Sequence, residues 1–182
     1  IAGFAERHPE QAARYYGGAA HTDHDAIAAL NTLFAQDGLV VYVPAGVALE
    51  QPVQLINLFR STGPIMANRR ILFIAEDGAS AKLLVCDHSM GNTDFLSTEV
   101  IEIFAGRDAV VDYYDLEESS IRTSRFSSLF AMQEAGSNVL VNGITLNNGQ
   151  TRNNYRVRIN GEGAELTLCG MAIEDREQRV DT

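Results

Sequence analysis

The chain is poor in cysteine, in basic side chains and in long apolar runs. Its two cysteines, Cys86 and Cys169, lie far apart and form no CxxC pair, which excludes a disulfide framework and a self-contained structural zinc site. The 14 basic residues against 24 acidic ones give a net charge of −10, which argues against nucleic acid or an anionic membrane surface as the main partner. No apolar run approaches the ~20 residues of a membrane helix, and no basic–apolar signal segment opens the sequence. We therefore expect a cytoplasmic protein with free thiols.

The motifs of common catalytic sites are also absent. The sequence contains no GxGxxG, P-loop, GxSxG or HExxH pattern. Its 182 residues, 46% of them hydrophobic, are enough for one domain with a sizeable core, or one domain with a small extension. We predict that the protein is not an enzyme and that it has no catalytic, cofactor-binding or metal-binding residue.

Five segments share one layout, in which an extended apolar run, a glycine turn and a second apolar run follow each other. The turn glycines are Gly46, Gly78, Gly106, Gly136 and Gly163, at spacings of 32, 28, 30 and 27 residues. Three residues after each glycine stand Leu49, Ala81, Ala109, Val139 and Leu166, and five residues after it stand Gln51, Leu83, Val111, Val141 and Leu168. A fixed period with matching inward columns is typical of a stacked solenoid, in which no coil can bury its apolar face alone.

The pattern predicts an all-β core, a right-handed parallel β-helix of about five coils with two or three strands each. The alternative is a β-sandwich, whose turns would fall every ~8–12 residues, about a third of the spacing found here. The last coil shows the clearest alternation, with Tyr155, Val157 and Ile159 on one face and Arg156 and Arg158 on the other.

The first 36 residues differ from the rest and predict a short helical lead-in (1–36) before the β-helix core (37–182). A helical stretch around Pro9–Tyr16 ends at two glycines, and Ile27, Leu30 and Phe34 follow helical spacing. We expect Thr22 to cap this second helix in a pair with Asp25. The lead-in is a candidate cover for the first open edge of the solenoid.

Two groups of side chains could carry chemistry, and both have a plainer interpretation. Cys86 and His88 lie two apart on one strand, on the outward face with Lys82, but a zinc site needs about four ligands. Cys169 is predicted to be outward and inert. The acidic stretch comprises Asp108, Asp112, Asp115, Glu117 and Glu118. Outward carboxylates of this kind would suit a carbohydrate-active β-helix enzyme, of lyase or hydrolase type; the plainer interpretation is a solvated turn.

Two stretches carry a family resemblance. The frame "ALN…F…DG…YVP.GV.LE.P" over Ala29–Leu58, and the rung RNNYRVRINGEGAELTLCG followed by Q-x-VDT at Gln178–Thr182, resemble the SufB/SufD family of iron–sulfur cluster assembly proteins. The resemblance runs from about Pro9 to Thr182. Because the lead-in has no cysteine cluster, SufD is the closer match.

The resemblance implies a non-catalytic scaffold subunit that pairs with a SufB-like paralogue or as a homodimer and binds a SufC-like ATPase. It implies an iron–sulfur cluster only in the assembled complex. At Arg179 the chain has arginine where many relatives have histidine, so no cluster ligand is assigned. The second half of the family's β-helix and its C-terminal helical segment have no counterpart here. We therefore expect the core to be truncated at its C-terminal end, and the isolated chain to self-associate or to have a disordered last rung.

Overall fold

The computed structural model describes residues 1–35 and 38–182. The helices are α1 (Ala2–Arg7), α2 (Pro9–Tyr15), the 3₁₀ turn η1 (Thr22–His24) and α3 (Ala26–Phe34). The strands are β1 (Leu39–Val43), β2 (Val53–Arg60), β3 (Ile65–Ala75), β4 (Ser80–Met90), β5 (Phe95–Ala105), β6 (Val110–Glu118), β7 (Thr123–Gln133), β8 (Asn138–Asn147), β9 (Gln150–Ile159), β10 (Glu165–Ala172) and β11 (Arg179–Asp181). The predicted boundary at 36/37 lies outside the described residues.

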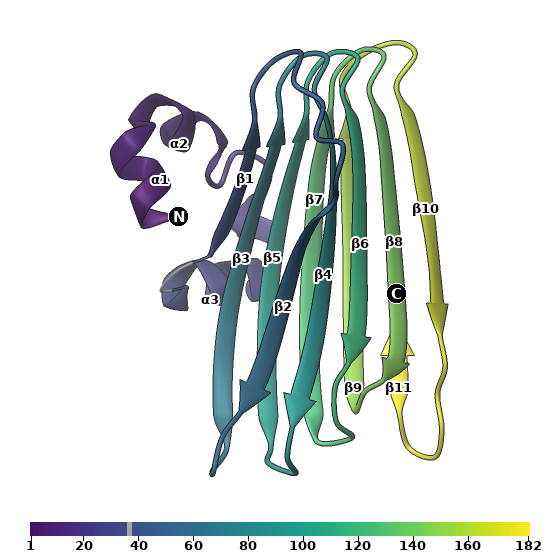
Figure 1. Ribbon diagram of the computed structural model, residues 1–182. Helices are drawn as coiled ribbons and strands as arrows, with labels where there is room; N and C mark the ends of the chain where they lie inside the picture. The colour runs from purple at the N-terminus through teal and green to yellow at the C-terminus, as the bar shows by residue number, and fades with distance from the viewer. Residues whose placement is uncertain (36–37) are drawn as a thin grey trace.

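The strands form a parallel β-solenoid of about five coils, with two strands in each coil (Figure 1). One sheet, called here sheet A, has the order β1-β3-β5-β7-β9-β11, and the other, sheet B, has the order β10-β8-β6-β4-β2. Every pair of neighbouring strands is parallel. The predicted parallel β-helix is therefore confirmed, and the sandwich alternative is wrong.

The glycine turns stack at one end of the molecule, but the prediction of Gly106 as the third turn residue is wrong. The left-handed turn residues are Gly46, Gly78, Asp108, Gly136 and Gly163, with φ between 55° and 71°. The N–H of each of the first four donates to a carbonyl of the next turn at 2.7–3.0 Å. Asp108, not Gly106, is therefore the third turn residue, and Asp tolerates this backbone region better than most side chains.

This correction shifts the predicted columns in the third coil by two residues. Val139 lies over Val111, and Val141 over Tyr113, so Ala109 and Val111 do not occupy the columns predicted for them. Side chains in a strand alternate with period two, so the shift left both residues facing inward, and both are fully buried. In the first coil Val53, not Gln51, pairs with Leu83, because the chain after the first turn is longer.

The inner faces of the two sheets form the main core near the glycine turns. Its members are apolar side chains from both sheets, among them Phe73, Leu83, Ile103, Val111 and Val141. Tyr155 and Val157 of β9 pack against this core from the predicted inward face. The core thus follows the alternation that the sequence indicated.

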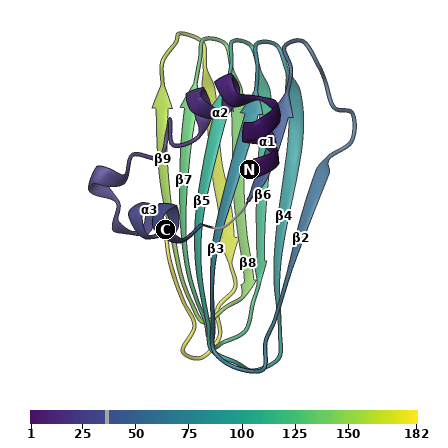
Figure 2. The ribbon, with the colours of Figure 1, turned by 90° about the vertical axis from the view of Figure 1, so that its left-hand side faces the viewer.

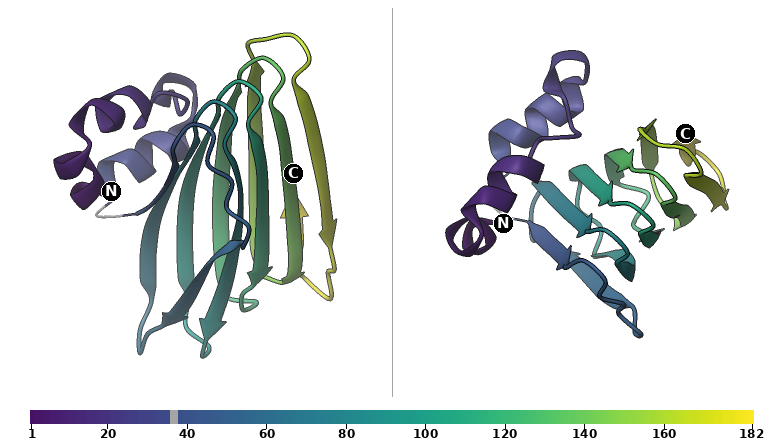
Figure 3. Two further views of the ribbon diagram at one scale, coloured as in Figure 1. Left: turned by 45° about the horizontal axis from the view of Figure 1, so that its top comes forward. Right: turned by 90° about the horizontal axis from the view of Figure 1, so that it is seen from above.

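The central strands of sheet A, β3, β5 and β7, are largely buried on both faces, because the helical lead-in covers the outer side of the sheet (Figure 2). Leu72 and Ile74 pack under α1 and α2, and Val100 and Phe130 pack under the segment that includes α3. The view along the strands shows the same layering, with the helices beside one sheet only (Figure 3). The expectation that the lead-in covers the first open edge is therefore wrong. Within the described residues no helix has the length and apolar character of a membrane span.

A buried carboxylate fixes the lead-in to sheet A. Glu102 of β5 accepts hydrogen bonds from the backbone N–H groups of Gly17, Ala19 and Ala20 at 2.9–3.0 Å. It also pairs with Arg70 of β3 at 2.7 Å. Because one carboxyl group accepts from all three backbone donors, this turn can lie against an apolar sheet.

The N-cap of α3 is Asp25 and not Thr22, the residue that the sequence predicted. Asp25 Oδ1 accepts from the Ala28 N–H at 2.9 Å. Thr22 instead is the first residue of η1. The other Asp25 oxygen pairs with Arg156 of β9 at 2.6 Å, so this cap also ties α3 to the sheet.

We expect Val141→Asp to destabilise the protein by several kcal/mol, because an unpaired carboxylate would enter a dry core or be forced neutral. The matched control is Asn142→Asp, which changes the next side chain on the opposite, outward face. Urea unfolding followed by circular dichroism should separate the two variants. Equal midpoints would contradict the assigned register.

The turn assignment makes a second prediction. Asp108→Gly should change stability by less than ~1 kcal/mol, since glycine suits the left-handed backbone. Gly106→Ala should cost ~1–3 kcal/mol through overpacking, because an added Cβ would lie 2.7 Å from the Asp77 backbone nitrogen. Thermal unfolding of both variants checks this, and a tolerated Gly106→Ala would show that the turns are looser than described.

Candidate functional site

Away from the glycine turns the solenoid interior changes from apolar to charged. Two arginines and four carboxylates face each other between the sheets, and we call them the interior charge cluster: Arg69, Asp87, Glu99, Asp115, Glu117 and Arg125. Strand parity places them there, since Arg69 continues the inward series of Phe73 and Ile71, and Asp115 continues that of Val111 and Tyr113.

Arg125 of β7 is the centre of the cluster. Its Nη2 lies 2.8 Å from Glu99 Oε2 and 2.5 Å from Asp115 Oδ2. Its Nε lies 3.5 Å from Asp87, and its Nη1 lies 3.7 Å from Glu117. One guanidinium from sheet A therefore meets carboxylates of both sheets, and its side chain is 2% exposed.

Asp87 has the strongest set of donors. Arg69 holds it with two bonds, at 2.6 and 2.5 Å, and the Asn57 amide donates at 2.9 Å. Burial alone would raise the pKa of Asp87, but the charges of Arg69 and Arg125 outweigh burial and lower it. Asp87 is thus an ionised carboxylate in the protein interior.

Glu117 is surrounded by hydroxyl donors. Ser119 donates to it at 2.9 Å, Thr151 at 2.8 Å and Thr145 at 3.4 Å. These side chains come from the turn after β6 and from strands β9 and β8. Hydroxyls from three elements thus replace the water that a carboxylate of this kind would otherwise need.

Glu99 and Asp115 share the Nη2 of Arg125 and have fewer donors. Burial raises the pKa of Glu99 and of Asp115, and the arginines only partly offset it. Burial also raises the pKa of Tyr155, on the facing strand β9, to about 12. This part of the interior therefore favours neutral acids over ionised ones.

The predicted acidic stretch is divided between the two faces of β6. Asp115 and Glu117 lie inside the solenoid, whereas Asp112 faces outward and pairs with Lys82 at 2.9 Å. Glu118 is exposed and pairs with His88 at 3.2 Å, and Asp108 lies in a turn. The interpretation as a solvated turn is wrong, and so is that of five outward carboxylates. The alternation after Val111 was the signal for the inward pair.

Both cysteines lie on the outer face of sheet B. Cys86 lies on the outward side of β4 as predicted, but its neighbours bury it, and the Gln54 amide donates to its sulfur at 3.6 Å. Cys169 is outward and exposed, also as predicted. Among the described residues no three His, Cys, Asp or Glu side chains are arranged to hold a metal ion.

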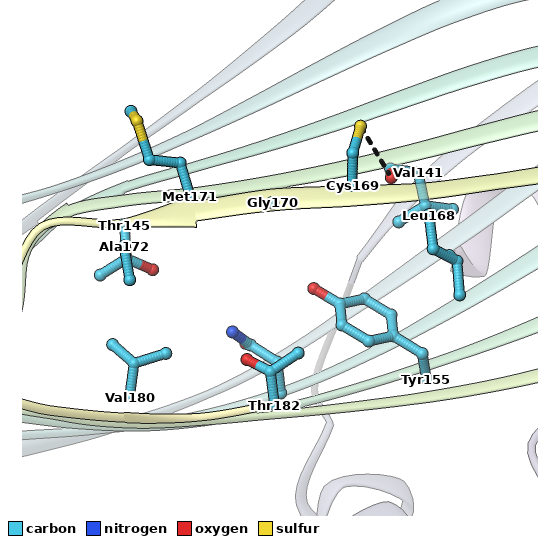
Figure 4. A pocket seen from close by; sticks show the side chains of 12 residues that line it. Val141, Thr145, Tyr155, Leu168, Cys169, Gly170, Met171, Ala172, Val180 and Thr182 are labelled. Atoms are coloured by element: carbon cyan, nitrogen blue, oxygen red, sulfur yellow. Dashed lines mark hydrogen bonds between the residues drawn. The ribbon is translucent and has the colours of Figure 1, made fainter.

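The interior opens between the last coils. A hollow of about 420 Å³ lies there between β10 and the strands β9 and β11. Figure 4 shows Tyr155, Leu168 and Val180 facing this hollow, while Cys169 and Met171 point to the other side of β10. Thr145 links it to the interior charge cluster, because this threonine both lines the hollow and donates to Glu117.

Comparison with known proteins identifies the family. Residues 58–182 match the model described as "SUF system FeS cluster assembly, SufBD core domain", and residues 1–55 match the SufBD N-terminal region. The chain belongs to the SufBD family. The division near residue 56 differs from ours at 36/37, since the family's N-terminal model includes the first strand of the solenoid.

Several curated relatives are similar to this SufBD chain over part of their length. An iron–sulfur cluster assembly SufBD family protein from Synechocystis is 31% identical over 142 residues, which are 77% of this chain and 27% of the relative. A SufBD family protein of Staphylococcus epidermidis is 31% identical over 105 residues, 57% of this chain and 22% of the relative. The chloroplastic protein ABCI7 of Arabidopsis thaliana is 24% identical over 169 residues, 86% of this chain and 34% of the relative. The chain therefore spans between about a fifth and a third of the length of these relatives.

We expect Arg125→Met to destabilise the protein by ~3–5 kcal/mol, because it leaves buried carboxylates uncompensated. Adding Glu99→Gln should recover part of this loss. The control is Arg122→Met, whose ion pair with Asp94 is largely exposed and should contribute less than ~1 kcal/mol. Denaturant unfolding measures all three, and an Arg125→Met variant as stable as the control would contradict the central role of Arg125.

Proposed function

We propose that this chain is part of a non-catalytic scaffold subunit that works in a Suf-type iron–sulfur cluster assembly complex. In this proposal the full-length protein pairs with a SufB-like paralogue, or with a second copy of itself, and binds a SufC-like ATPase. The nascent cluster is the cargo of the complex. The observation that carries the proposal is the match of both the N-terminal region and the core to SufBD models along one continuous solenoid.

The geometry supports a scaffold role in two ways. Glu102 and Asp25 bond the lead-in to sheet A. The helices and the solenoid therefore form one packed unit. The charged side chains inside are already bonded to one another.

The SufD-like assignment rests on the sequence. The first 85 residues contain no cysteine, and position 179 is arginine. Arg179 lies in the last strand, β11, where its backbone N–H and carbonyl bond to Gly149 and Asn148. We further propose a cytoplasmic location, although one relative is chloroplastic by name.

The competing function is that of a carbohydrate-active β-helix enzyme. It needs outward, converging carboxylates, and the acidic stretch supplies only Asp112 and Glu118 on the outer face of β6, each paired with a base. Two carboxylates that are each already in contact with a neighbouring lysine or histidine side chain are poorly suited to acid–base catalysis.

The test is to co-purify the full-length protein with the SufB-like and SufC-like proteins of its own organism, and to reconstitute cluster formation with and without it. We expect a stable complex and faster cluster formation. The variant Asp112→Asn with Glu118→Gln serves as control, since it should leave both results unchanged. Failure to bind either protein, together with calcium-dependent cleavage of an acidic polysaccharide that this variant abolishes, would establish the enzyme instead.

A further inference from the structure

The four carboxylates of the interior charge cluster are not equally supported. Asp87 receives three hydrogen bonds from Arg69 and Asn57, and Glu117 receives bonds from hydroxyl groups on both oxygens. In contrast, Glu99 Oε1 and Asp115 Oδ1 are buried without a hydrogen-bond donor. Two of the four acids therefore have an oxygen that nothing in the described interior satisfies.

These two acids meet at one nitrogen. Arg125 Nη2 lies 2.8 Å from Glu99 Oε2 and 2.5 Å from Asp115 Oδ2. The remaining Glu99 oxygen is 3.3 Å from Arg69 Nη1, outside hydrogen-bond geometry. The hydroxyl of Tyr113, buried on the same strand as Asp115, is also without a partner. Carboxyl groups that share one donor repel each other when both are ionised.

The charges facing this pair do not balance. The titratable and charged groups around it are Arg69 from β3, Asp87 from β4, Glu117 and Tyr113 from β6, Arg125 from β7 and Tyr155 from β9. Arg69 and Arg125 supply two positive charges for four carboxyl groups. Ionising all four acids would therefore leave two uncompensated negative charges among buried groups, which is very unfavourable.

We infer that Glu99 and Asp115 together bind one proton at neutral pH, so that the solenoid interior is a proton-binding site. One acid stays neutral and its partner keeps the contact with Arg125. The proton is the cation that fits, because no metal-ligand arrangement exists among the described residues. Loss of this proton would drive the two acids apart and loosen the end of the solenoid opposite the glycine turns.

The direction of the pH effect follows from the raised pKa of both acids. The folded protein holds a proton that the unfolded chain releases above the ordinary carboxyl pKa of ~4. This contribution to stability is complete below that pH and is lost as pH rises through the folded pKa. Asp87, whose pKa is lowered, acts in the opposite direction and loses its contribution in strong acid.

Infrared spectroscopy of the full-length protein tests the inference. At pH 7 the wild type should show the C=O stretch of one protonated carboxyl group per chain, and this band should disappear on titration to high pH. Glu99→Gln and Asp115→Asn should each remove it at pH 7, because the single remaining acid ionises against Arg125. Asp112→Asn, an outward acid on the same strand as Asp115, should leave the band unchanged.

Near-ultraviolet circular dichroism shows whether each variant is folded. If a variant does not fold, the infrared titration of the wild type still supports or refutes the inference. The inference is overturned if the wild type has no protonated carboxyl at pH 7, or if the band survives in both folded variants. A metal ion bound in a one-to-one ratio and lost on either substitution would overturn it as well.

Discussion

Along the described strands, inward side chains lie over the equivalent side chains of the next coil, because the strands of both sheets are parallel and in register, apart from one shift between Glu117 and Glu118. In such a stack, neighbours ~4.8 Å apart in the sheet must be compatible with each other. Apolar columns satisfy this requirement directly, as Ala81, Val111 and Val139 do. The columns of charged residues satisfy it only with help from the facing sheet.

The interior charge cluster shows how that help is given. Asp87 lies beside Glu117 in sheet B, and two stacked carboxylates repel each other. Arg125 reaches both from sheet A, while hydroxyls of Ser119, Thr145 and Thr151 complete Glu117. The compensation of these stacked carboxylates therefore depends on the two sheets together, because their cation comes from sheet A.

The two sheets differ on their outer faces for a related reason. Sheet A carries continuous apolar runs such as Ile71–Ala75. One face of this run packs in the core between the sheets, and the other face packs against the lead-in. Sheet B alternates, and in the part of the chain described here no helix lies over it.

The sequence by itself determined the repeat, the parallel solenoid, the helical lead-in and the family, because these depend on local spacing, alternation and motif. It failed where two segments had to be compared in space. The sequence pattern favours Gly106 as the third turn residue, because glycine is the residue that most often adopts a left-handed backbone. Only the hydrogen bonds between neighbouring turns show that Asp108 holds that position.

The tertiary structure likewise decided the cap at Asp25, the face that the lead-in covers, and the inward course of Asp115 and Glu117. It alone revealed the interior charge cluster. Arg69, Asp87, Glu99 and Arg125 come from four strands, and only the closing of two sheets against each other brings their charges within a few ångströms.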